Sequence, residues 1–249
     1  MRIWVRVDPG ENGSGFQRER AYGRADGAAE RGMEKTIRGY WGVRLKSVRK
    51  ALEANNFEVF VAEDQEEARE VVLENILPGT GAHSVSWGGS GTFLSTGLYE
   101  RLRGMSDLRI LDTFEKNISR AESVERRRQA LLVDLFITGT NAVTEAGQLV
   151  NLDMYGNRVA AITFGPRFVT ILVGRNKIVP DLEAAMRRVR EYAAPANAMR
   201  LGKKTPCAET ARCESCKSPE RICNTWTITE KSLPARRIKV VLINQDVGL

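Results

Sequence analysis

The sequence lacks any hydrophobic run that could cross a membrane as a helix, which takes about 18 consecutive apolar residues. Its longest apolar runs, such as Val159–Ile162 and Ile171–Val173, have only the length of strands. The first residues also lack the apolar stretch of a secretory signal, because Pro9 and Gly10 interrupt it. We therefore expect a cytoplasmic protein without a membrane span.

Histidine is almost absent: His83 is the only one among 249 residues. No serine, cysteine or carboxylate stands at a spacing that would complete a catalytic triad with it, so we interpret His83 as structural. The sequence also lacks the Gly-Lys-Ser/Thr of a Walker A loop and the Gly-x-Gly-x-x-Gly of a dinucleotide-binding turn. It therefore carries no nucleotide-cofactor fingerprint.

Basic residues exceed acidic ones by 38 to 31, which gives a net charge of +7. No basic face interleaved with aromatic residues accompanies this excess, so we do not predict nucleic-acid binding. Much of the excess follows Met199, where ten lysines and arginines face five acids. Cysteine thiolates on a metal leave a negative site, which such basic neighbours would offset.

The chain divides into three parts by composition. Residues 1–32 hold six glycines and few aliphatic residues, so we predict a disordered tail. Met33 could be the biological start. Residues 33–200 alternate between helix-like and strand-like patterns, and residues 201–249 hold the cysteines and two closing strands. We predict helices and strands alternating in the order of an α/β fold with a doubly wound, largely parallel sheet. The predicted strands are Phe57–Ala62, Ser84–Trp87, Arg109–Leu111, Asp134–Thr138, Val159–Phe164, Phe168–Val173, Thr225–Glu230 and Ile238–Ile243, with a hairpin within Asn141–Asn157.

All four cysteines of the chain fall within 17 residues, as Cys207-x5-Cys213-x2-Cys216-x6-Cys223. In a reducing compartment such spacing indicates a metal site before a disulfide. Reduced buried thiols or a redox pair are the alternative. Either zinc or a [4Fe-4S] cluster takes four thiolates, and we favour the cluster slightly.

A glycine-rich turn follows the predicted strand Ser84–Trp87 and precedes a helix. Its backbone N–H groups could approach an anion, and its hydroxyls could donate hydrogen bonds. A turn that serves only the fold is the alternative. We expect ligand contacts from Gly88, Gly89, Ser90, Gly91 and Thr92.

A second polar segment follows the strand Asp134–Thr138, and Glu145 is its only charged residue up to Asn151. Glu145 could act as a nucleophile or general base, or it could be a solvated acid on a hairpin turn. Other polar residues near strand ends could line the same pocket, or cap turns and loops. We expect this pocket to be lined by Asn141, Thr144, Asn151, Asp153 and Asn157, with Arg175 and Lys177 reaching an anionic ligand.

These segments together resemble the LUD-domain family of lactate-utilization proteins, over about Glu34 to Gly248. The resemblance rests on the residues from Trp87 to Ser90, from Asp134 to Glu145, from Val173 to Val179, from Ala194 to Asn197 and from Cys207 to Cys223. It is specific for a branch with C-terminal cysteines. It implies a fold like the ribose-5-phosphate isomerase and CoA-transferase superfamily. It also implies work beside iron–sulfur and oxidoreductase subunits that oxidise L-lactate.

Three functions follow as hypotheses. The first is an accessory or electron-transfer component of the oxidation of L-lactate or a similar hydroxy acid. The second is an enzyme that acts on a phosphorylated sugar or CoA ester through Glu145, as CoA transferases use a glutamate. The third is a metal-stapled binding module without catalysis. A small anionic ligand suits all three, and the chain is compatible with a homo-oligomer.

Overall fold

The computed structural model describes the backbone of residues 15–249 and the side chains of residues 29–249. Two compact units divide at residues 40 and 41, and helix α1 (Gly15–Ala54) runs through this division. Of the predicted tail 1–32, residues 1–14 lie outside the described residues. From Gly15 the backbone is helical, because the stretch contains no proline and several helix-favouring alanines, arginines and glutamates.

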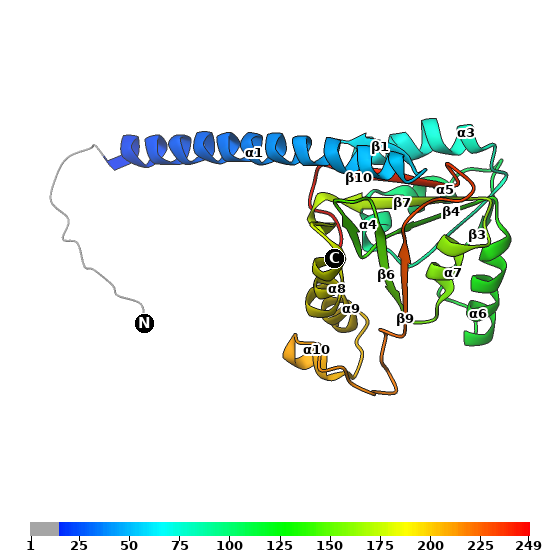
Figure 1. Cartoon of the computed structure of the whole chain (residues 1–249). Helices are drawn as coiled ribbons and strands as arrows, with labels where there is room; N and C mark the ends of the chain where they lie inside the picture. The colour runs from blue at the N-terminus through cyan, green and yellow to red at the C-terminus, as the bar shows by residue number, and fades with distance from the viewer. Residues whose placement is uncertain (1–14) are drawn as a thin grey trace. The chain divides into compact units, whose positions relative to one another are not determined.

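The second unit, Trp41–Leu249, is built on a six-stranded sheet in the order β1-β10-β7-β4-β2-β3 (Figure 1). Every pairing in this sheet is parallel. The predicted fold class, a largely parallel α/β sheet, is confirmed. The strands are β1 (Glu58–Ala62), β2 (Ser84–Trp87), β3 (Arg109–Leu111), β4 (Leu135–Gly139), β7 (Phe168–Gly174) and β10 (Ile238–Ile243).

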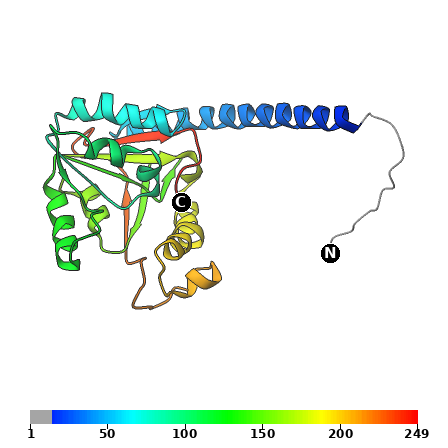
Figure 2. The same ribbon diagram turned by 180° about the vertical axis from the view of Figure 1, so that it is seen from behind.

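A smaller sheet has the order β8-β5-β6-β9, and Figure 2 shows both sheets from behind. Its centre is the predicted hairpin, in which Ala142 pairs with Val150 in antiparallel register. The strands are β5 (Ala142–Thr144), β6 (Leu149–Asp153), β8 (Ile178–Val179) and β9 (Thr225–Thr229).

Short helices connect the strands. Asp64 caps the first of these by accepting hydrogen bonds from the backbone N–H groups of Glu66 and Glu67. The helices are α2 (Gln65–Glu70), which continues through Val71–Ile76 into α3 (Leu77–Thr80), then α4 (Gly91–Ser95), α5 (Leu98–Arg103), α6 (Arg120–Gln129), α7 (Asn157–Thr163), α8 (Leu182–Arg188), which continues through Val189–Ala193 into α9 (Ala194–Arg200), and α10 (Pro206–Thr210).

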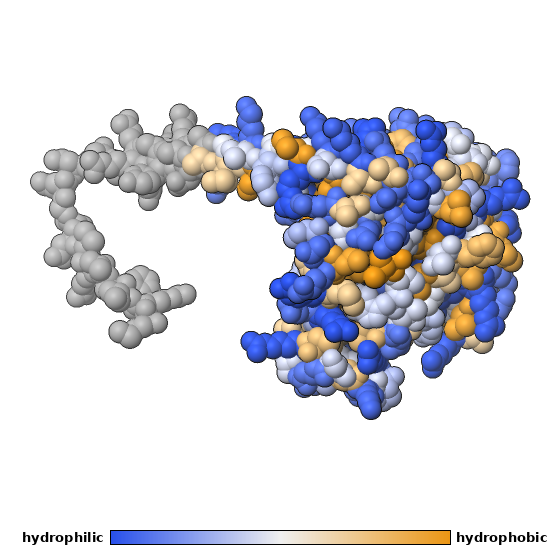
Figure 3. Space-filling view, in the orientation of Figure 1, coloured by the Kyte–Doolittle hydropathy of each residue, from blue (hydrophilic) through white to orange (hydrophobic). Residues whose placement is uncertain are grey.

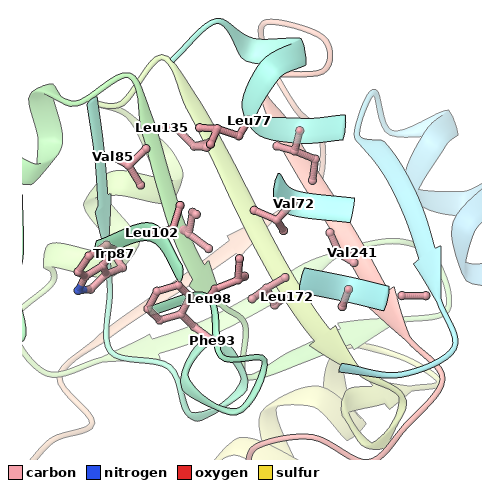
Figure 4. Close-up of a cluster of buried hydrophobic side chains, with 14 of the residues drawn as sticks. Val72, Leu77, Val85, Trp87, Phe93, Leu98, Leu102, Leu135, Leu172 and Val241 are labelled. Atoms are coloured by element: carbon pink, nitrogen blue, oxygen red, sulfur yellow. The ribbon is translucent and has the colours of Figure 1, made fainter. Parts of the chain in front are cut away.

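Helices α2 to α5 pack on one face of the large sheet, where alternate strand residues point toward them (Figure 4). Trp87 is fully buried there and stacks on Phe93 with ring centroids 5.5 Å apart. The opposite face is covered by the end of α1 and by the small sheet. Leu45, Val48 and Leu52 of α1 are buried on that face. Because strand side chains alternate between faces, each central strand contributes to both cores.

Two sequence predictions differ from the structure. The apolar run Val159–Phe164 is predicted as a strand, but Asn157–Thr163 forms helix α7. A short apolar run has the same composition in a buried strand and in a buried helix, so periodicity cannot separate them. In addition, β10 lies inside the large sheet between β1 and β7. The predicted boundary between residues 200 and 201 therefore separates β10 from the other strands of its own sheet. Within residues 201–249, the cysteine segment lies outside both sheets.

In the part of the chain that the structure describes, no helix combines the length and apolar character needed to span a membrane. Figure 3 shows mainly hydrophilic side chains on one face, interrupted by smaller hydrophobic areas.

The interior position of β10 yields a stability prediction. Leu242→Ala should lower the free energy of unfolding by about 2–5 kcal/mol, because Leu242 is fully buried and its truncation leaves a cavity. Leu132→Ala is the matched control, since Leu132 is 83% exposed, and it should change stability by less than about 0.5 kcal/mol. Urea denaturation measures both. Equal effects would contradict the placement of β10 in the core.

Candidate functional site

A cleft of about 580 Å³ lies where strands β2 and β4 of the large sheet end. Open parallel sheets bind their ligands outside the carboxyl ends of the strands, and the cleft occupies that position. Gly89, Ser90 and Gly91 line it after β2, and Gly139, Thr140 and Asn141 line it after β4. The far wall comes from α9 and the loop that follows, with Asn197, Arg200 and Lys203.

Arg158 of α7 is the central charged residue of the cleft, and it is only 7% exposed. Its Nη1 donates to Gly139 O at 2.9 Å and to Asn151 Oδ1 at 2.7 Å. Its Nη2 donates to Asn141 Oδ1 at 3.0 Å and to Leu152 O at 2.9 Å. All four acceptors are neutral, and burial lowers the pKa of Arg158.

The local sequence explains why Arg158 points inward. Gly156 adopts a positive φ of 84°, which a side chain would strain, and it turns the chain from β6 into α7. Asp153 then accepts the backbone N–H of Arg158 at 3.0 Å and holds the first turn of the helix. At Gly88 an added Cβ would stand 3.1 Å from Arg158 Cγ. Gly88 therefore makes room for the arginine side chain.

The charges that line the cleft are mostly positive. Arg127, Arg158, Arg200 and Lys203 face a single acidic side chain, that of Asp153, whose oxygens already accept backbone N–H groups. Among the described residues, the charged side-chain nitrogens of Arg158, Arg200 and Lys203 form no ion pair with a carboxylate within 4 Å. Such a cleft attracts a negatively charged ligand.

Asn141 adds a polar group whose orientation is fixed. Its Oδ1 accepts hydrogen bonds from Leu152 N at 2.9 Å and from Arg158 Nη2. The amide nitrogen is therefore the remaining donor, and it makes no hydrogen bond to any described residue. Because Asn141 lines the cleft, this N–H₂ group is available to a ligand.

Lys177 lies behind the cleft wall and is 4% exposed. Its Nζ donates to Thr92 Oγ1 at 2.7 Å, and Thr92 in turn donates to Val247 O at 3.3 Å. Burial, together with the charges of Arg188 and Arg158, lowers the pKa of Lys177 from 10.5 to about 7. Lys177 and Thr92 were each predicted to contact an anionic ligand; they bond to each other instead, and neither lines the cleft.

Glu145 lies at the turn of the β5–β6 hairpin, whereas Asn141 and Asn151 lie at the hairpin's other end. Its carboxylate pairs with Arg44 and is partly exposed. The neighbouring Thr144 hydroxyl bonds to Gln148 within the same hairpin. Neither Glu145 nor Thr144 lines the cleft, so the structure does not bring the predicted nucleophile to the other predicted ligand residues. The turn instead docks on α1, where Asn55 donates to Ala146 O.

The remaining predicted residues have separate positions. Asp153 and Asn157 line the cleft at the start of α7. Asn151 is fully buried and positions Arg158 from behind. Arg175 pairs with Asp246 at 3.0 Å and does not line the cleft.

The four cysteines line one small pocket that adjoins the cleft. Within the described part of the chain, no group of three or more histidine, cysteine or acidic side chains is placed to hold a single metal ion. Arg221 Nε lies 3.1 Å from Cys223 Sγ, and Thr205 Oγ1 lies 3.3 Å from Cys207 Sγ. The predicted metal site therefore remains a prediction.

Sequence reasoning missed the cleft's arginines and lysine. Arg158 directly precedes the apolar run Val159–Ile162, and an arginine next to a run expected to be buried was the available signal. Arg200 and Lys203 gave no such signal, because they resemble ordinary surface residues until the fold brings their loop over the sheet.

A model of the LUD domain matches residues 45–243, and no curated protein matches the chain. A solved DUF162-family protein from Deinococcus radiodurans is 16% identical, with a TM-score of 0.47, and the match covers 82% of this chain and 98% of that one.

Two ribose-5-phosphate isomerases are also similar to this chain. One, in complex with phospho-erythronic acid, is 18% identical with a TM-score of 0.30, and the match covers 47% of this chain and 56% of that one. The other, from Plasmodium falciparum, is 13% identical with a TM-score of 0.28, and the match covers 46% and 54%. These likenesses concern the fold alone.

The buried Lys177 predicts a pH dependence of stability. Its folded pKa lies below its unfolded value of 10.5, so between about pH 7 and 10.5 the unfolded chain holds a proton that the folded chain has released. The contribution of Lys177 to the free energy of unfolding therefore rises with pH across that window, with a slope that approaches about 1.4 kcal/mol per pH unit. Lys177→Met should abolish this contribution and stabilise the protein most at pH 6.

Chemical denaturation at pH 6, 7, 8 and 9 measures the free energy of unfolding of wild type and variant. Taking the difference between the two cancels the contribution of the other titrating groups. Lys231→Met is the control, because Lys231 is exposed, and its difference from wild type should be independent of pH. If the gain in free energy of unfolding of Lys177→Met over wild type does not shrink as the pH rises, Lys177 does not carry a destabilising buried charge.

Proposed function

Because the chain belongs to the LUD-domain family of lactate-utilization proteins, we propose that its cleft binds the carboxylate of a hydroxy acid or oxo acid. In this proposal the chain is an accessory component in the oxidation of L-lactate or a similar hydroxy acid. The observation that carries the proposal is the buried Arg158, whose guanidinium has only neutral hydrogen-bond acceptors.

Arg158 favours an anionic ligand for an electrostatic reason. A buried charge is costly unless an opposite charge compensates it. Asp153 acts on Arg158 through its charge, but its carboxylate forms no ion pair with the guanidinium and instead accepts the backbone N–H of Arg158 at the start of α7. A carboxylate ligand in the cleft would supply the missing negative charge, so binding should be favoured by the desolvated surroundings.

Direct contacts would come from other groups, since four of the five N–H donors of Arg158 are already used. The Asn141 amide nitrogen and the Lys203 ammonium line the same cleft. Arg200 is held in place by two hydrogen bonds to Asn197 Oδ1, at 3.0 and 2.7 Å. In this scheme Arg158 supplies fixed charge, and Asn141, Arg200 and Lys203 supply hydrogen bonds.

Oxidation of a 2-hydroxy acid to a 2-oxo acid releases two electrons and two protons. Arginine, lysine and asparagine side chains bind and orient the acid, but they do not accept those electrons. The electrons would therefore pass to a redox centre or partner subunit, which is why we propose an accessory role. An enzyme that uses Glu145 on a phosphorylated sugar or CoA ester is less well supported, because Glu145 lies outside the cleft.

Calorimetric titration with L-lactate and pyruvate tests the proposal. Both acids should bind the wild-type chain, and Arg200→Gln should weaken binding by roughly tenfold, the effect of about 1.4 kcal/mol for one lost charged hydrogen bond. Arg127→Gln and Arg128→Gln form a matched pair of neighbours. Arg127 lines the cleft and should matter, whereas Arg128 is exposed outside it and should not.

Phosphate, ribose 5-phosphate and coenzyme A serve as competing ligands in the same titration. Tight binding of a phosphorylated ligand without binding of either acid would favour the sugar or CoA hypothesis. Binding of L-lactate or pyruvate that ignores both Arg127→Gln and Arg200→Gln would place the acid elsewhere and contradict the proposal.

A further inference from the structure

All four cysteines of the chain converge on one pocket, although they come from different turns of the segment between α9 and β9. Figures 1 and 2 show this segment, in orange, beside α9. The pocket is also lined by Glu214, Arg221 and Trp226. Cys213 is exposed and the other three are half-buried, so packing in the core does not explain why they meet in one pocket.

The backbone is bent to achieve this convergence. Ala211 and Ser215 have positive φ values of 57° and 50°, an arrangement that is unfavourable for residues other than glycine. Ala211 ends α10 two residues before Cys213, and Ser215 directly precedes Cys216. Such strained residues are retained where the local geometry has a purpose.

Arg221 braces the thiols from one side. Its Nη1 donates to Cys216 O at 2.9 Å, and its Nε donates to Cys223 O at 2.9 Å and to Cys223 Sγ at 3.1 Å. A guanidinium beside the sulfurs would offset part of the negative charge of metal-bound thiolates. The pocket also contains Arg190, so the negative charge of several thiolates would be partly offset.

The spacing of the sulfurs separates two kinds of metal site. In a zinc site each Zn–S bond is about 2.3 Å, which places the sulfurs only about 3.8 Å apart. In a four-iron cluster each thiolate binds its own iron, so the sulfurs stand farther apart around a larger core. The described cysteines share one pocket but are not placed to hold a single ion. Four-cysteine zinc sites often use two Cys-x2-Cys pairs, whereas this chain has one, which favours the cluster.

We propose that Cys207, Cys213, Cys216 and Cys223 hold a [4Fe-4S] cluster that lies against the wall of the anion cleft. The cluster, when bound, would exchange one electron at a time. The chain's own residues fix its position: the cysteines hold it, and Arg221 and Trp226 cover it.

The pocket and the cleft share a wall. Leu152, Ala194 and Ile222 line both, and Leu152 and Ile222 are buried. A single layer of apolar side chains thus separates the cysteine pocket from the site proposed for the acid. This part of the inference rests on the proposed function. An anion bound in the cleft would change the electrostatic field at the cluster, because apolar side chains screen charge poorly.

The experiment begins with the full chain, purified anaerobically and reconstituted with iron and sulfide. We expect about four iron atoms and four sulfides per chain, and a brown absorption that bleaches when dithionite supplies one electron per cluster. The reduced cluster should give an electron paramagnetic resonance spectrum. Cys213→Ala and Cys223→Ala should each abolish most of the cluster, whereas Glu214→Gln, also in the pocket wall, should keep it.

Two results would contradict the proposed cluster. One zinc and no iron per chain would refute the cluster, and so would iron that survives both cysteine substitutions. Circular dichroism of each variant distinguishes loss of the cluster from loss of the fold.

Pyruvate added to the reduced protein tests the coupling to the cleft. The spectrum should shift in the wild type, and Arg200→Gln should need roughly tenfold more pyruvate for the same shift. If pyruvate binds by calorimetry without any spectral shift, the coupling is wrong. If the cluster forms but neither L-lactate nor pyruvate binds, the proposed function fails while the metal site stands.

Discussion

The hydrogen bonds of the buried Arg158 guanidinium organise the candidate site. They join the end of β4, through Gly139 and Asn141, to the end of β6, through Asn151 and Leu152. The two sheets are thereby tied together at the cleft, where a ligand would sit. All of these acceptors are neutral, and among the described residues no carboxylate forms an ion pair with the guanidinium, although Asp153 acts on it through its charge. The same contacts thus stabilise the fold and hold a buried positive charge that favours the binding of an anion.

A second consequence concerns the buried Lys177. Its ammonium lies close enough to Arg158 and Arg188 for their charges to lower its pKa further. Three cationic side chains therefore stand around the ends of β4 and β7 in a poorly solvated region. A fold that only needed stability would replace such residues with apolar ones of similar volume. Of the three, only Arg158 lines the cleft, so only Arg158 is placed to act on a ligand there.

The sequence predicted the parallel sheet well, because its strands are short apolar runs between helical patterns and turn residues. Strands such as Ser84–Trp87 and Ile238–Ile243 agree with their predicted bounds. It could not place β10 between β1 and β7, since strand order depends on contacts between residues far apart in the chain. It also misread α7, where the apolar run follows one buried arginine.

The candidate site was predicted only in part for a similar physical reason. Gly89 to Gly91, Asn141, Asp153 and Asn157 meet in the cleft because strand ends of a parallel sheet lie together. Glu145 was the sharpest chemical prediction, but it faces Arg44 at the hairpin turn, because a hairpin carries its two ends away from its tip. The cysteine segment was expected to be a separate appendage, yet its pocket shares Leu152 and Ile222 with the cleft.

The central claim is that the charge of Arg158 is compensated by a bound organic anion. A crystal structure of the chain with pyruvate tests it most directly. We predict the carboxylate of pyruvate in the cleft, within hydrogen-bond distance of the Asn141 amide nitrogen and of Arg200 or Lys203. Pyruvate bound outside the cleft, or a protein carboxylate paired with Arg158, would contradict the claim.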